Sequence, residues 1–463
     1  MLNDWQNESC RILHKALARL KEGFGSLPAA DSSVSNGEPL ERVLLETADR
    51  LRDNYPYFHP LYAGQMLKPP HPVALLAYTL AQSLNPNNHA LDGGRASSVM
   101  EKEAVAGLAR MLGWQTHLGH LCSGGTIANL EALWIASQLA PGKRMLVSQQ
   151  AHYTHRRLSD LLKLECEIIP CDRKGRIDVQ ALANSLARGG AGTVIATIGT
   201  TATGSVDPLP EILKLREQYG FRLHADAAYG GYFGLATNLD EKTRRSFDCL
   251  ARVDSIVIDP HKHGLQPYGC GCIIFKDPGV GRFYAHDSPY TYFTSQEMHL
   301  GEISLECSRP GAAAVALWAT QKLYPLLKGG DFATMLEKCH AAALALFEKL
   351  RADARWLTAF APELDIVVWL PRAKRVSEVS ALSRQVFASA ATQNLHLALA
   401  ALPVDFFDLE SAGIASDSLT VTCLRSVLMK PEHSNWVEQI WQILNQSLTN
   451  AQTKLAQSRC RMT

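Results

Sequence analysis

The chain has 463 residues, of which 46% are hydrophobic and 20% are charged, and its formal net charge is +1. This length and composition are typical of a globular protein with more than one lobe and exclude an intrinsically disordered chain. A near-neutral charge without a strongly basic or acidic block makes nucleic acid and anionic membranes poor candidates for partners.

The first part of the chain is predicted to be mainly helical. A helix is predicted near residues 5–23, and the linker that follows at 26–39 is rich in Ser, Pro, Gly and Asn. Residues 41–115 continue in a helical pattern, interrupted by LKPPHP and LNPNNHALDGG. We therefore predict an N-terminal helical segment over residues 1–75.

From about residue 120, short β-rich runs alternate with amphipathic helical runs. Strands are predicted at 145–148, 165–169, 193–198, 221–225, 254–258 and 271–275, with helices at 126–139, 177–188 and 208–218. This alternation predicts an α/β fold in which a large, mostly parallel sheet has helices on both faces. Ligands of such sheets bind beyond the carboxyl ends of the strands, so the residues after each strand are candidates for a site.

The last part of the chain predicts a smaller α+β lobe. Helices are predicted at 311–327, 333–351 and 434–457, and strands at 364–370, 395–402 and 418–424. We therefore predict a large domain over residues 76–330 and a small C-terminal domain over residues 331–463.

The cysteines and the first residues bear on the cellular compartment. Eleven scattered cysteines, an odd number, are typical of a reduced cytoplasmic protein. Cys270 and Cys272 have no second pair at zinc-like spacing, so no metal site is expected. The start MLNDWQNESC has no basic segment followed by an apolar core, and no apolar run approaches the length of a membrane span. We expect a cytoplasmic protein.

The segment CSGGTIANL, residues 122–130, places two glycines and Thr126 at the start of a predicted helix. Free backbone N–H groups at a helix start bind phosphate when small residues allow a close approach. A helix cap by Ser123 or Thr126 explains the same residues without a ligand.

Two further strand ends carry small or polar residues. Asp226 begins DAAYGG directly after the strand at 221–225, and a flat ring could lie against Ala228. A buried aspartate that caps a loop is an equally good explanation. GTTATG follows the strand at 193–198. It is either a strand end whose hydroxyl groups border a binding site or simply a turn.

Lys262 lies in DPHKHG, directly after the strand at 254–258. Burial disfavours the charge of a lysine, so a lysine here is costly unless it has a function. The same cost favours the neutral, nucleophilic amine that Schiff-base chemistry requires. A side chain that extends to the rim of the protein is the alternative.

One α/β lobe therefore combines a phosphate cradle, a carboxylate and a lysine. Pyridoxal 5′-phosphate (PLP) needs all three, for its phosphate, its pyridine nitrogen and its aldehyde. The anion keeps the nitrogen protonated, so that the ring can accept electrons from the Cα of a substrate. These residues predict PLP as the cofactor.

The chain resembles the PLP-dependent group II decarboxylases, which include the aromatic-L-amino-acid, tyrosine and glutamate decarboxylases. LHADAAYGG and DPHKHG match the cofactor motifs of that family, SGGTIANLEAL its phosphate-loop helix, and QQAHYTH the stretch whose histidine stacks on the ring. The resemblance runs from about residue 55 to about residue 445. It implies PLP fold type I with a seven-stranded sheet, and decarboxylation of an aromatic or acidic L-amino acid. It also implies a homodimer with the active site at the subunit interface.

The resemblance also implies roles for single residues. Lys262 would bind the PLP aldehyde, and Asp226 would pair with the pyridine nitrogen. His152 would be a catalytic residue that stacks over the ring and borders the substrate carboxylate. The remaining cofactor contacts would come from Gly124, Gly125, Thr126, Thr201, Ala228 and His261. Many relatives have asparagine where this chain has Asp259, and a carboxylate there would repel the phosphate unless His261 or a cation compensated.

Two positions bear on the type of reaction. HDSPYTYF, residues 286–293, resembles a loop whose tyrosine protonates the substrate carbon after CO2 leaves, and Tyr290 is the candidate, with Tyr292 as its rival. Arg425, in TCLRSVLMKP, is the candidate for binding the substrate carboxylate. An interlobe salt bridge explains Arg425 as well. For Arg309, in ECSRPGA, a structural role is an open alternative to carboxylate binding, and His263 is expected to have a packing or interface role.

Related chemistries remain as alternatives. A carbon–carbon lyase resembling sphingosine-1-phosphate lyase would use much of the same cofactor site, and decarboxylation-dependent transamination would follow from protonation at another carbon. A non-catalytic protein that retains the fold is disfavoured by the presence of both Lys262 and Asp226.

Overall fold

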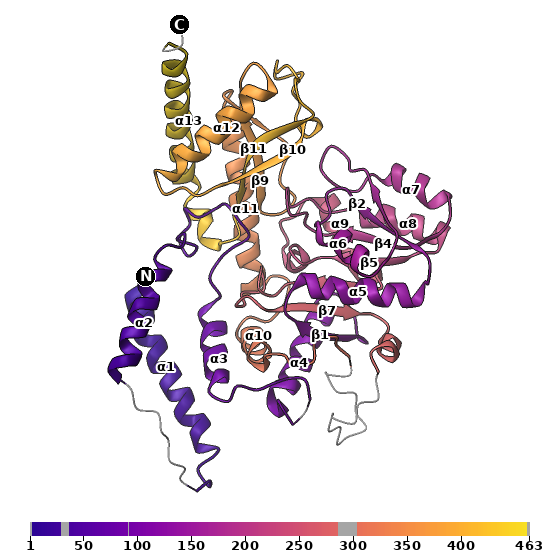
Figure 1. The fold of residues 1–463 in the computed structure, drawn as a ribbon, viewed down its shortest axis with the longest axis vertical. Coiled ribbons are helices and arrows are strands. Elements are labelled where there is room, and N and C mark those ends of the chain that lie inside the picture. Colours follow the sequence, from indigo (N-terminus) through magenta and orange to yellow (C-terminus); the bar gives the residue numbers. More distant parts are fainter. Residues whose placement is uncertain (1, 29–36, 91, 286–302, 461–463) are drawn as a thin grey trace.

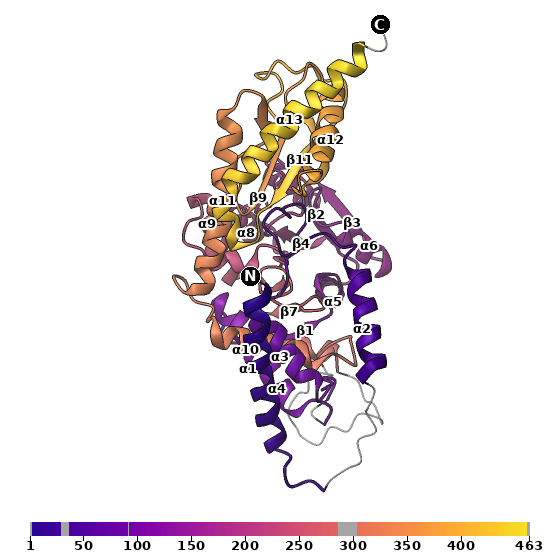
Figure 2. The same ribbon diagram turned by 90° about the vertical axis from the view of Figure 1, so that its left-hand side faces the viewer.

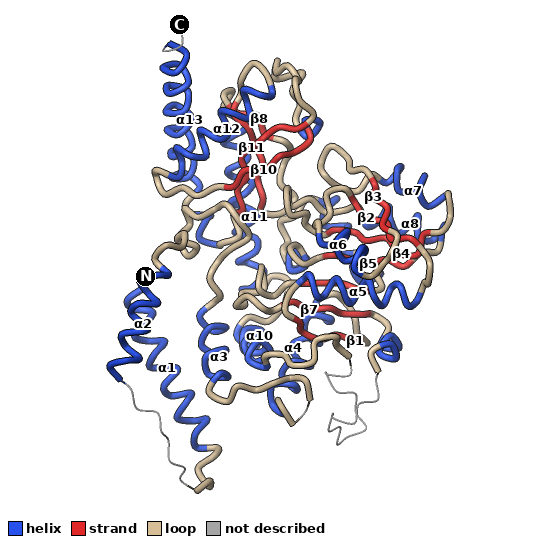
Figure 3. Tube along the Cα trace, in the orientation of Figure 1, coloured by secondary structure: helices blue, strands red, loops and turns tan. Residues whose placement is uncertain are grey.

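Two β-sheets, each packed with helices, make up the body of the protein (Figure 1). The structure is a computed structural model, and it describes all residues except 1, 29–36, 91, 286–302 and 461–463. The strands of the two sheets and the helices around them are distinguished in Figure 3.

The large sheet has seven strands in the order β1-β7-β6-β5-β4-β2-β3. Its strands are β1 (Leu118–Cys122), β2 (Arg144–Ser148), β3 (Cys166–Ile169), β4 (Ala191–Thr197), β5 (Arg222–Asp226), β6 (Ser255–Ile258) and β7 (Gly271–Phe275). Strands β2 to β6 are parallel, whereas β7 is antiparallel to both β6 and β1. The predicted α/β class with a mostly parallel sheet of seven strands is confirmed.

Helices cover both faces of this sheet. They are α4 (Arg95–Met111), α5 (Gly125–Leu139), α6 (Thr154–Leu161), α7 (Val179–Ala187), α8 (Leu209–Tyr219), α9 (Glu241–Asp248) and α10 (Gly311–Leu323). Along β2, Met145 and Val147 belong to one apolar core with residues of α5 and α6, whereas Leu146 belongs to another with residues of α7 and α8. Both faces of the strand are buried, which explains its unbroken apolar sequence.

The second sheet is antiparallel, with the order β10-β11-β9-β8. Its strands are β8 (Trp356–Thr358), β9 (Ile366–Pro371), β10 (Ala398–Pro403) and β11 (Thr420–Val427), and its helices are α11 (Asp331–Ala352), α12 (Val376–Ala391) and α13 (Val437–Cys460). Residues of this sheet and of its helices share a core that contains the buried Trp356 and Trp369. In Figure 2, α13 and α12 lie along this sheet.

Sequence reasoning missed β1, β8 and α12 as well as the short α6 and α9. The sequence of β1, LGHLC, has no β-branched residue, and its pairing with β7 brings together residues far apart in the chain. Helix α12 is rich in serine, a weak helix former. Burial of Val379, Leu382 and Val386, at helical spacing, stabilises α12 through packing.

Three helices form the N-terminal part, namely α1 (Leu2–Glu22), α2 (Gly37–Leu51) and α3 (Pro72–Gln82). Figures 1 and 2 show α1 and α2 projecting from the body. The predicted boundary at residue 75 falls inside α3, whereas the one at residue 331 coincides with the start of α11; the division into domains itself stays a prediction. Within the described residues, no helix is both long enough and apolar enough to cross a membrane.

Candidate active site

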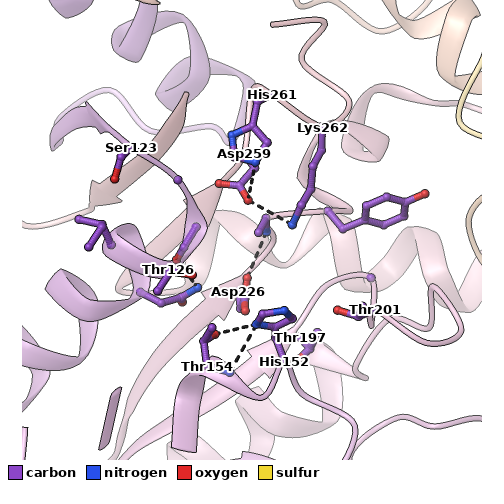
Figure 4. A pocket seen from close by; sticks show the side chains of 17 residues that line it. Ser123, Thr126, His152, Thr154, Thr197, Thr201, Asp226, Asp259, His261 and Lys262 are labelled. Atoms are coloured by element: carbon purple, nitrogen blue, oxygen red, sulfur yellow. Dashed lines mark hydrogen bonds and ion pairs between the residues drawn. The ribbon is translucent and has the colours of Figure 1, made fainter. Parts of the chain in front are cut away.

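A cavity of about 300 Å³ lies beyond the carboxyl ends of β4, β5 and β6. Each neighbouring element contributes to its wall: β4 contributes Thr197, β5 contributes Asp226, the segment after β6 contributes Lys262, and the start of α5 contributes Gly125. Figure 4 shows these segments around one space. The cavity is therefore at the edge of the sheet where the strand order predicts a ligand.

The start of α5 has no side-chain cap. Gly124 is at the N-cap position, and no described side chain accepts a capping hydrogen bond there, so capping by Ser123 or Thr126 does not explain this segment. Ser123, Gly124, Gly125 and Thr126 all line the cavity. The unpaired N–H groups and the positive end of the helix dipole suit an anion such as phosphate.

Asp226, the last residue of β5, is 5% exposed and is held by two donors. His155 Nε2 lies 2.7 Å from its Oδ2, and the backbone N–H of Ala228 donates to its Oδ1 at 3.2 Å. Burial alone would raise the pKa of Asp226, but the hydrogen bond and charge of His155 and the charge of Lys262 hold it below its ordinary value. The carboxylate is therefore ionised and suits a protonated pyridine nitrogen.

Lys262 and His261 converge on the carboxylate of Asp259. Lys262 Nζ lies 3.1 Å from Asp259 Oδ2, and His261 Nε2 lies 3.5 Å from the same oxygen. Figure 4 shows the amine pointing into the cavity. Asp259 Oδ1 and His261 Nδ1 are buried and have no hydrogen-bond partner in the described part of the chain. Burial lowers the pKa of His261.

His152 lines the same cavity, with Thr201 and Ala228. Its Nδ1 lies 2.8 Å from Thr154 Oγ1, and this contact fixes the orientation of the imidazole. Burial lowers the pKa of His152, which favours a neutral ring that can pack against a flat aromatic ligand. All nine residues predicted to contact the cofactor line this cavity.

The donor set fits PLP. An uncapped helix start suits its phosphate, an ionised aspartate suits its pyridine nitrogen, and the lysine amine suits its aldehyde. The unpartnered Asp259 Oδ1 and His261 Nδ1 show that part of this buried polar surface is not satisfied by the described protein groups.

Comparison with protein-family models decides the family. The model described as the pyridoxal-dependent decarboxylase conserved domain matches residues 35–370. The chain belongs to the pyridoxal-dependent decarboxylase family. It is a PLP-dependent amino acid decarboxylase, and the sequence-based expectation of family, cofactor and enzyme class is confirmed.

Individual relatives agree with this assignment. The decarboxylase is 30% identical over 310 residues to a probable L-tyrosine/L-aspartate decarboxylase of Methanosphaera stadtmanae, with coverage of 66% of this chain and 77% of the relative. It is 28% identical over 412 residues to an L-tyrosine decarboxylase of Enterococcus faecium, with coverage of 65% and 67%. It is 30% identical over 292 residues to an L-aspartate decarboxylase of Thermococcus kodakarensis, with coverage of 62% and 73%.

Solved structures share the fold. TDC from Oryza sativa, solved with PLP and tryptamine, matches with a TM-score of 0.75 at 18% identity and covers 97% of this chain and 98% of its own. Mouse CSAD matches with a TM-score of 0.75 at 19% identity, with coverage of 93% and 91%. At these identities the likeness concerns the fold.

Arg425 of the decarboxylase is buried beside the cavity but does not line it. Its Nη2 donates to the carbonyl of Thr201 at 2.7 Å, and its Nε donates to the carbonyl of Ala202 at 3.0 Å. Its Nη1 lies 3.3 Å from the carbonyl of Gly64. In this arrangement Arg425 joins β11 to two loops, and its binding of a substrate carboxylate stays a prediction.

His263 and Arg309 have structural surroundings. His263 Nε2 lies 3.2 Å from Asp365 Oδ2, and Asp365 also accepts a hydrogen bond from Tyr229 at 2.5 Å. His263 therefore links the segment after β6 to the segment before β9. Arg309 Nη1 lies 2.7 Å from Glu101 Oε1 and ties the segment before α10 to α4. Tyr290 and its rival Tyr292 lie outside the described residues.

Sequence reasoning missed His155, the partner of Asp226. His155 is the last residue of the QQAHYTH stretch, three positions after His152, so the motif that was recognised contains it. Its contact with Asp226 joins positions 71 residues apart, which no local pattern indicates. Asn129, which lines the cavity, and His224, whose Nε2 lies 3.0 Å from Asn129 Oδ1, were also missed.

Proposed function

We propose that the decarboxylase converts an aromatic L-amino acid, with L-tyrosine as the first candidate, into the corresponding amine and CO2. The convergence of Lys262, the Asp226–His155 pair and the uncapped start of α5 on one cavity carries this proposal. L-Aspartate is the second candidate, because relatives of the chain are named for both amino acids.

Each residue of the site would have its own role in binding the cofactor or the substrate. Lys262 would hold the cofactor and exchange it for the substrate amine, and Asp226 would keep a proton on the pyridine nitrogen. His152 would cover one face of the ring. Gly124, Gly125, Thr126 and His261 would bind the phosphate, while Thr201 and Ala228 would border the ring. When bound, PLP supplies the sink for the electron pair released with CO2.

Two further roles complete the proposal. Tyr290 would deliver the proton to Cα of the product, and Arg425 would bind the substrate carboxylate if its guanidinium turned from the carbonyls of Thr201 and Ala202. Each role gives a distinct kinetic signature. Loss of Tyr290 would affect kcat, whereas loss of Arg425 would first raise KM for the amino acid.

An aromatic wall near the cavity supports an aromatic substrate. The ring of Tyr268 lies 4.8 Å from the ring of His261, centroid to centroid. On its other side, Tyr268 lines a second cavity of about 800 Å³ together with Tyr55, Tyr57 and Phe58. An aromatic side chain that extends from the first cavity past His261 would meet mainly apolar and phenolic groups, with two cationic side chains among them.

A homodimer and a cytoplasmic location belong to the same proposal. None of the described residues of α2 is buried, and Leu40, Val43, Leu44 and Leu45 are each more than half exposed. Such an apolar helix surface on a folded protein is typical of an interface. The ten cysteines whose side chains the structure describes are all free thiols, which is typical of a reducing compartment.

A panel of amino acids tests the function directly. Purified protein loaded with PLP is given L-tyrosine, L-tryptophan, L-aspartate and L-glutamate, and CO2 and amine are measured together. We expect equal amounts of both from L-tyrosine, and loss of activity by at least about a hundredfold in Lys262→Ala. Lys276→Ala, a change of an exposed lysine, is the matched control.

The same assay separates the alternatives. Aldehyde with no CO2 would indicate a carbon–carbon lyase, and CO2 with a carbonyl product in place of the amine would indicate decarboxylation-dependent transamination. Activity with L-aspartate alone would replace the aromatic substrate with the acidic one. The absence of every product from the whole panel would contradict the proposed function.

A further inference from the structure

His155 is a fully buried imidazole that contacts the ligand-facing carboxylate from behind. It is the second residue of α6, it has no exposed surface, and its Nε2 lies 2.7 Å from Asp226 Oδ2. His155 does not line the cavity, whereas Asp226 does. His155 therefore acts on any bound group only through Asp226.

The contacts determine which nitrogen of His155 carries a hydrogen. An ionised carboxylate only accepts hydrogen bonds, so Nε2 must be the donor. Nδ1 is buried and has no partner among the described residues. Asp226 Oδ1 accepts the N–H of Ala228, so each carboxylate oxygen already has one protein donor. Donors to a carboxylate stabilise its ionised form relative to the protonated one.

Other titratable groups near Asp226 have different partners. His224 is bonded through Nδ1 to Ser255 and through Nε2 to Asn129, and burial lowers its pKa to about 3, so it is neutral. His152 bonds Thr154, and Lys262 Nζ pairs with Asp259. Among the described side chains, His155 is the one hydrogen-bond donor to Asp226.

We propose that His155 is a positioning residue that keeps the proton shared by Asp226 and the cofactor's pyridine nitrogen on the nitrogen. The inference rests on the proposed role of Asp226. A carboxylate and a pyridine that face each other share one proton, either as carboxylate and pyridinium or as carboxylic acid and neutral pyridine. The hydrogen bond from His155 stabilises the carboxylate and thus favours the pyridinium. Without it, Asp226 is the stronger base and takes the proton.

The position of this proton is measured by NMR on the holoenzyme loaded with PLP carrying ¹⁵N in its ring. The native protein should show the ¹⁵N chemical shift of a pyridinium. His155→Phe should move the shift towards that of a neutral pyridine and weaken PLP binding by about tenfold. His155→Gln, which retains an N–H donor, should restore the native shift at least in part.

A matched control is His224→Phe, which replaces a neighbouring buried histidine that does not bond Asp226. A merely structural role for His155 would leave the ¹⁵N shift of loaded His155→Phe at the native value, and that result would overturn the inference. If His155→Phe does not fold, the native protein labelled with ¹⁵N-histidine gives the answer. A ring hydrogen on Nδ1 rather than Nε2 of His155 would overturn it equally.

Failure of this inference is distinguishable from failure of the proposed function. If Asp226 does not face the pyridine nitrogen, Asp226→Ala leaves the ¹⁵N shift unchanged as well. If Asp226 has its proposed role and His155 does not, Asp226→Ala alters the shift and His155→Phe does not.

Discussion

Asp259 is an acidic residue that lies at the proposed phosphate site. A side chain added at Gly125 would place its Cβ 2.7 Å from Asp259 Oδ2, so the carboxylate lies against the first turn of α5. The positive end of a helix stabilises an anion there, and Lys262 adds a cation. The same first turn is the proposed phosphate site, so a bound phosphate and Asp259 would compete for the same positive groups.

Asp259→Asn should therefore bind PLP more tightly. Asparagine has nearly the same shape and removes the negative charge beside the phosphate, so we expect the Kd for PLP to fall by about tenfold, equivalent to about 1.4 kcal/mol. The measurement is a fluorescence titration of apoenzyme with PLP. Asp254→Asn, at the amino end of β6 and therefore opposite the cavity, is the control. Weaker binding in Asp259→Asn would show that Asp259 supports the site through Lys262 rather than opposing the phosphate.

At the scale of elements, β7 and the start of α5 depend on a close backbone contact. A Cβ at Gly271 would lie 2.5 Å from the backbone of Gly124. The glycine after the lysine motif thus makes room for the phosphate-loop glycine, which explains why β7 begins with a residue that has no side chain.

Gly271→Ala should separate β7 from the start of α5 and disturb the proposed phosphate site. We expect PLP affinity to fall by at least about tenfold while the far-ultraviolet circular dichroism stays near that of the native protein. Gly234→Ala is the control, because its Cβ would meet only Phe247 at an ordinary 3.6 Å. Unchanged affinity in Gly271→Ala would mean that the anion site tolerates movement of β7.

Asp207 joins two elements behind the site. Its two carboxylate oxygens accept the N–H groups of Ile177 and Thr197, each at 2.7 Å, and burial raises its pKa from 3.8 to about 7. A carboxyl whose pKa is raised by folding binds more protons in the folded protein. Its contribution to stability is therefore complete below pH 3.8 and is lost as the pH rises through about 7.

Asp207→Asn should remove this pH dependence. The variant loses one of two acceptors and is less stable at low pH, but the difference in free energy of unfolding between native protein and variant should narrow as the pH rises from about 4 to about 7. Urea unfolding of the holoenzyme at several pH values measures the difference. If the difference widens with pH, the two N–H donors stabilise the ionised carboxylate more than burial destabilises it, and the pKa of Asp207 is not raised.

At the scale of the whole molecule, packing within one chain does not explain the exposed apolar side chains of α2. Figure 2 shows α1 and α2 as separate rods at the edge of the molecule. In the proposed homodimer, the exposed leucines of α2 would be covered by the partner subunit.

Leu44→Glu should weaken the proposed dimer. Leu44 is 58% exposed, and a charge at an apolar interface costs more than the same charge in water. We expect the midpoint of dissociation to shift to at least about tenfold higher protein concentration, measured by analytical ultracentrifugation. Leu419→Glu, at a residue 87% exposed on the second sheet, is the control. A monomeric native protein, or an unaffected Leu44→Glu dimer, would contradict this assignment of the interface.

The local sequence determined much of the fold and of the site. Strands with both faces buried are continuous apolar runs, and the strand-end rule then led to Asp226 and Lys262. Both are recognisable locally because a charge close to the end of an apolar strand is costly without a function. The motifs around them were enough to predict the PLP-dependent decarboxylase family and its cofactor.

Only the tertiary structure decided which distant residues support the site. His155 meets Asp226 across 71 residues, and His263 meets Asp365, which directly precedes β9 of the second sheet. The guanidinium of Arg425, on β11, donates to backbone carbonyls of the segment that follows β4, a contact that no side-chain pattern indicates. Local sequence specifies propensity and periodicity, whereas such pairs depend on the order in which strands join the sheet. That order is a property of the whole chain.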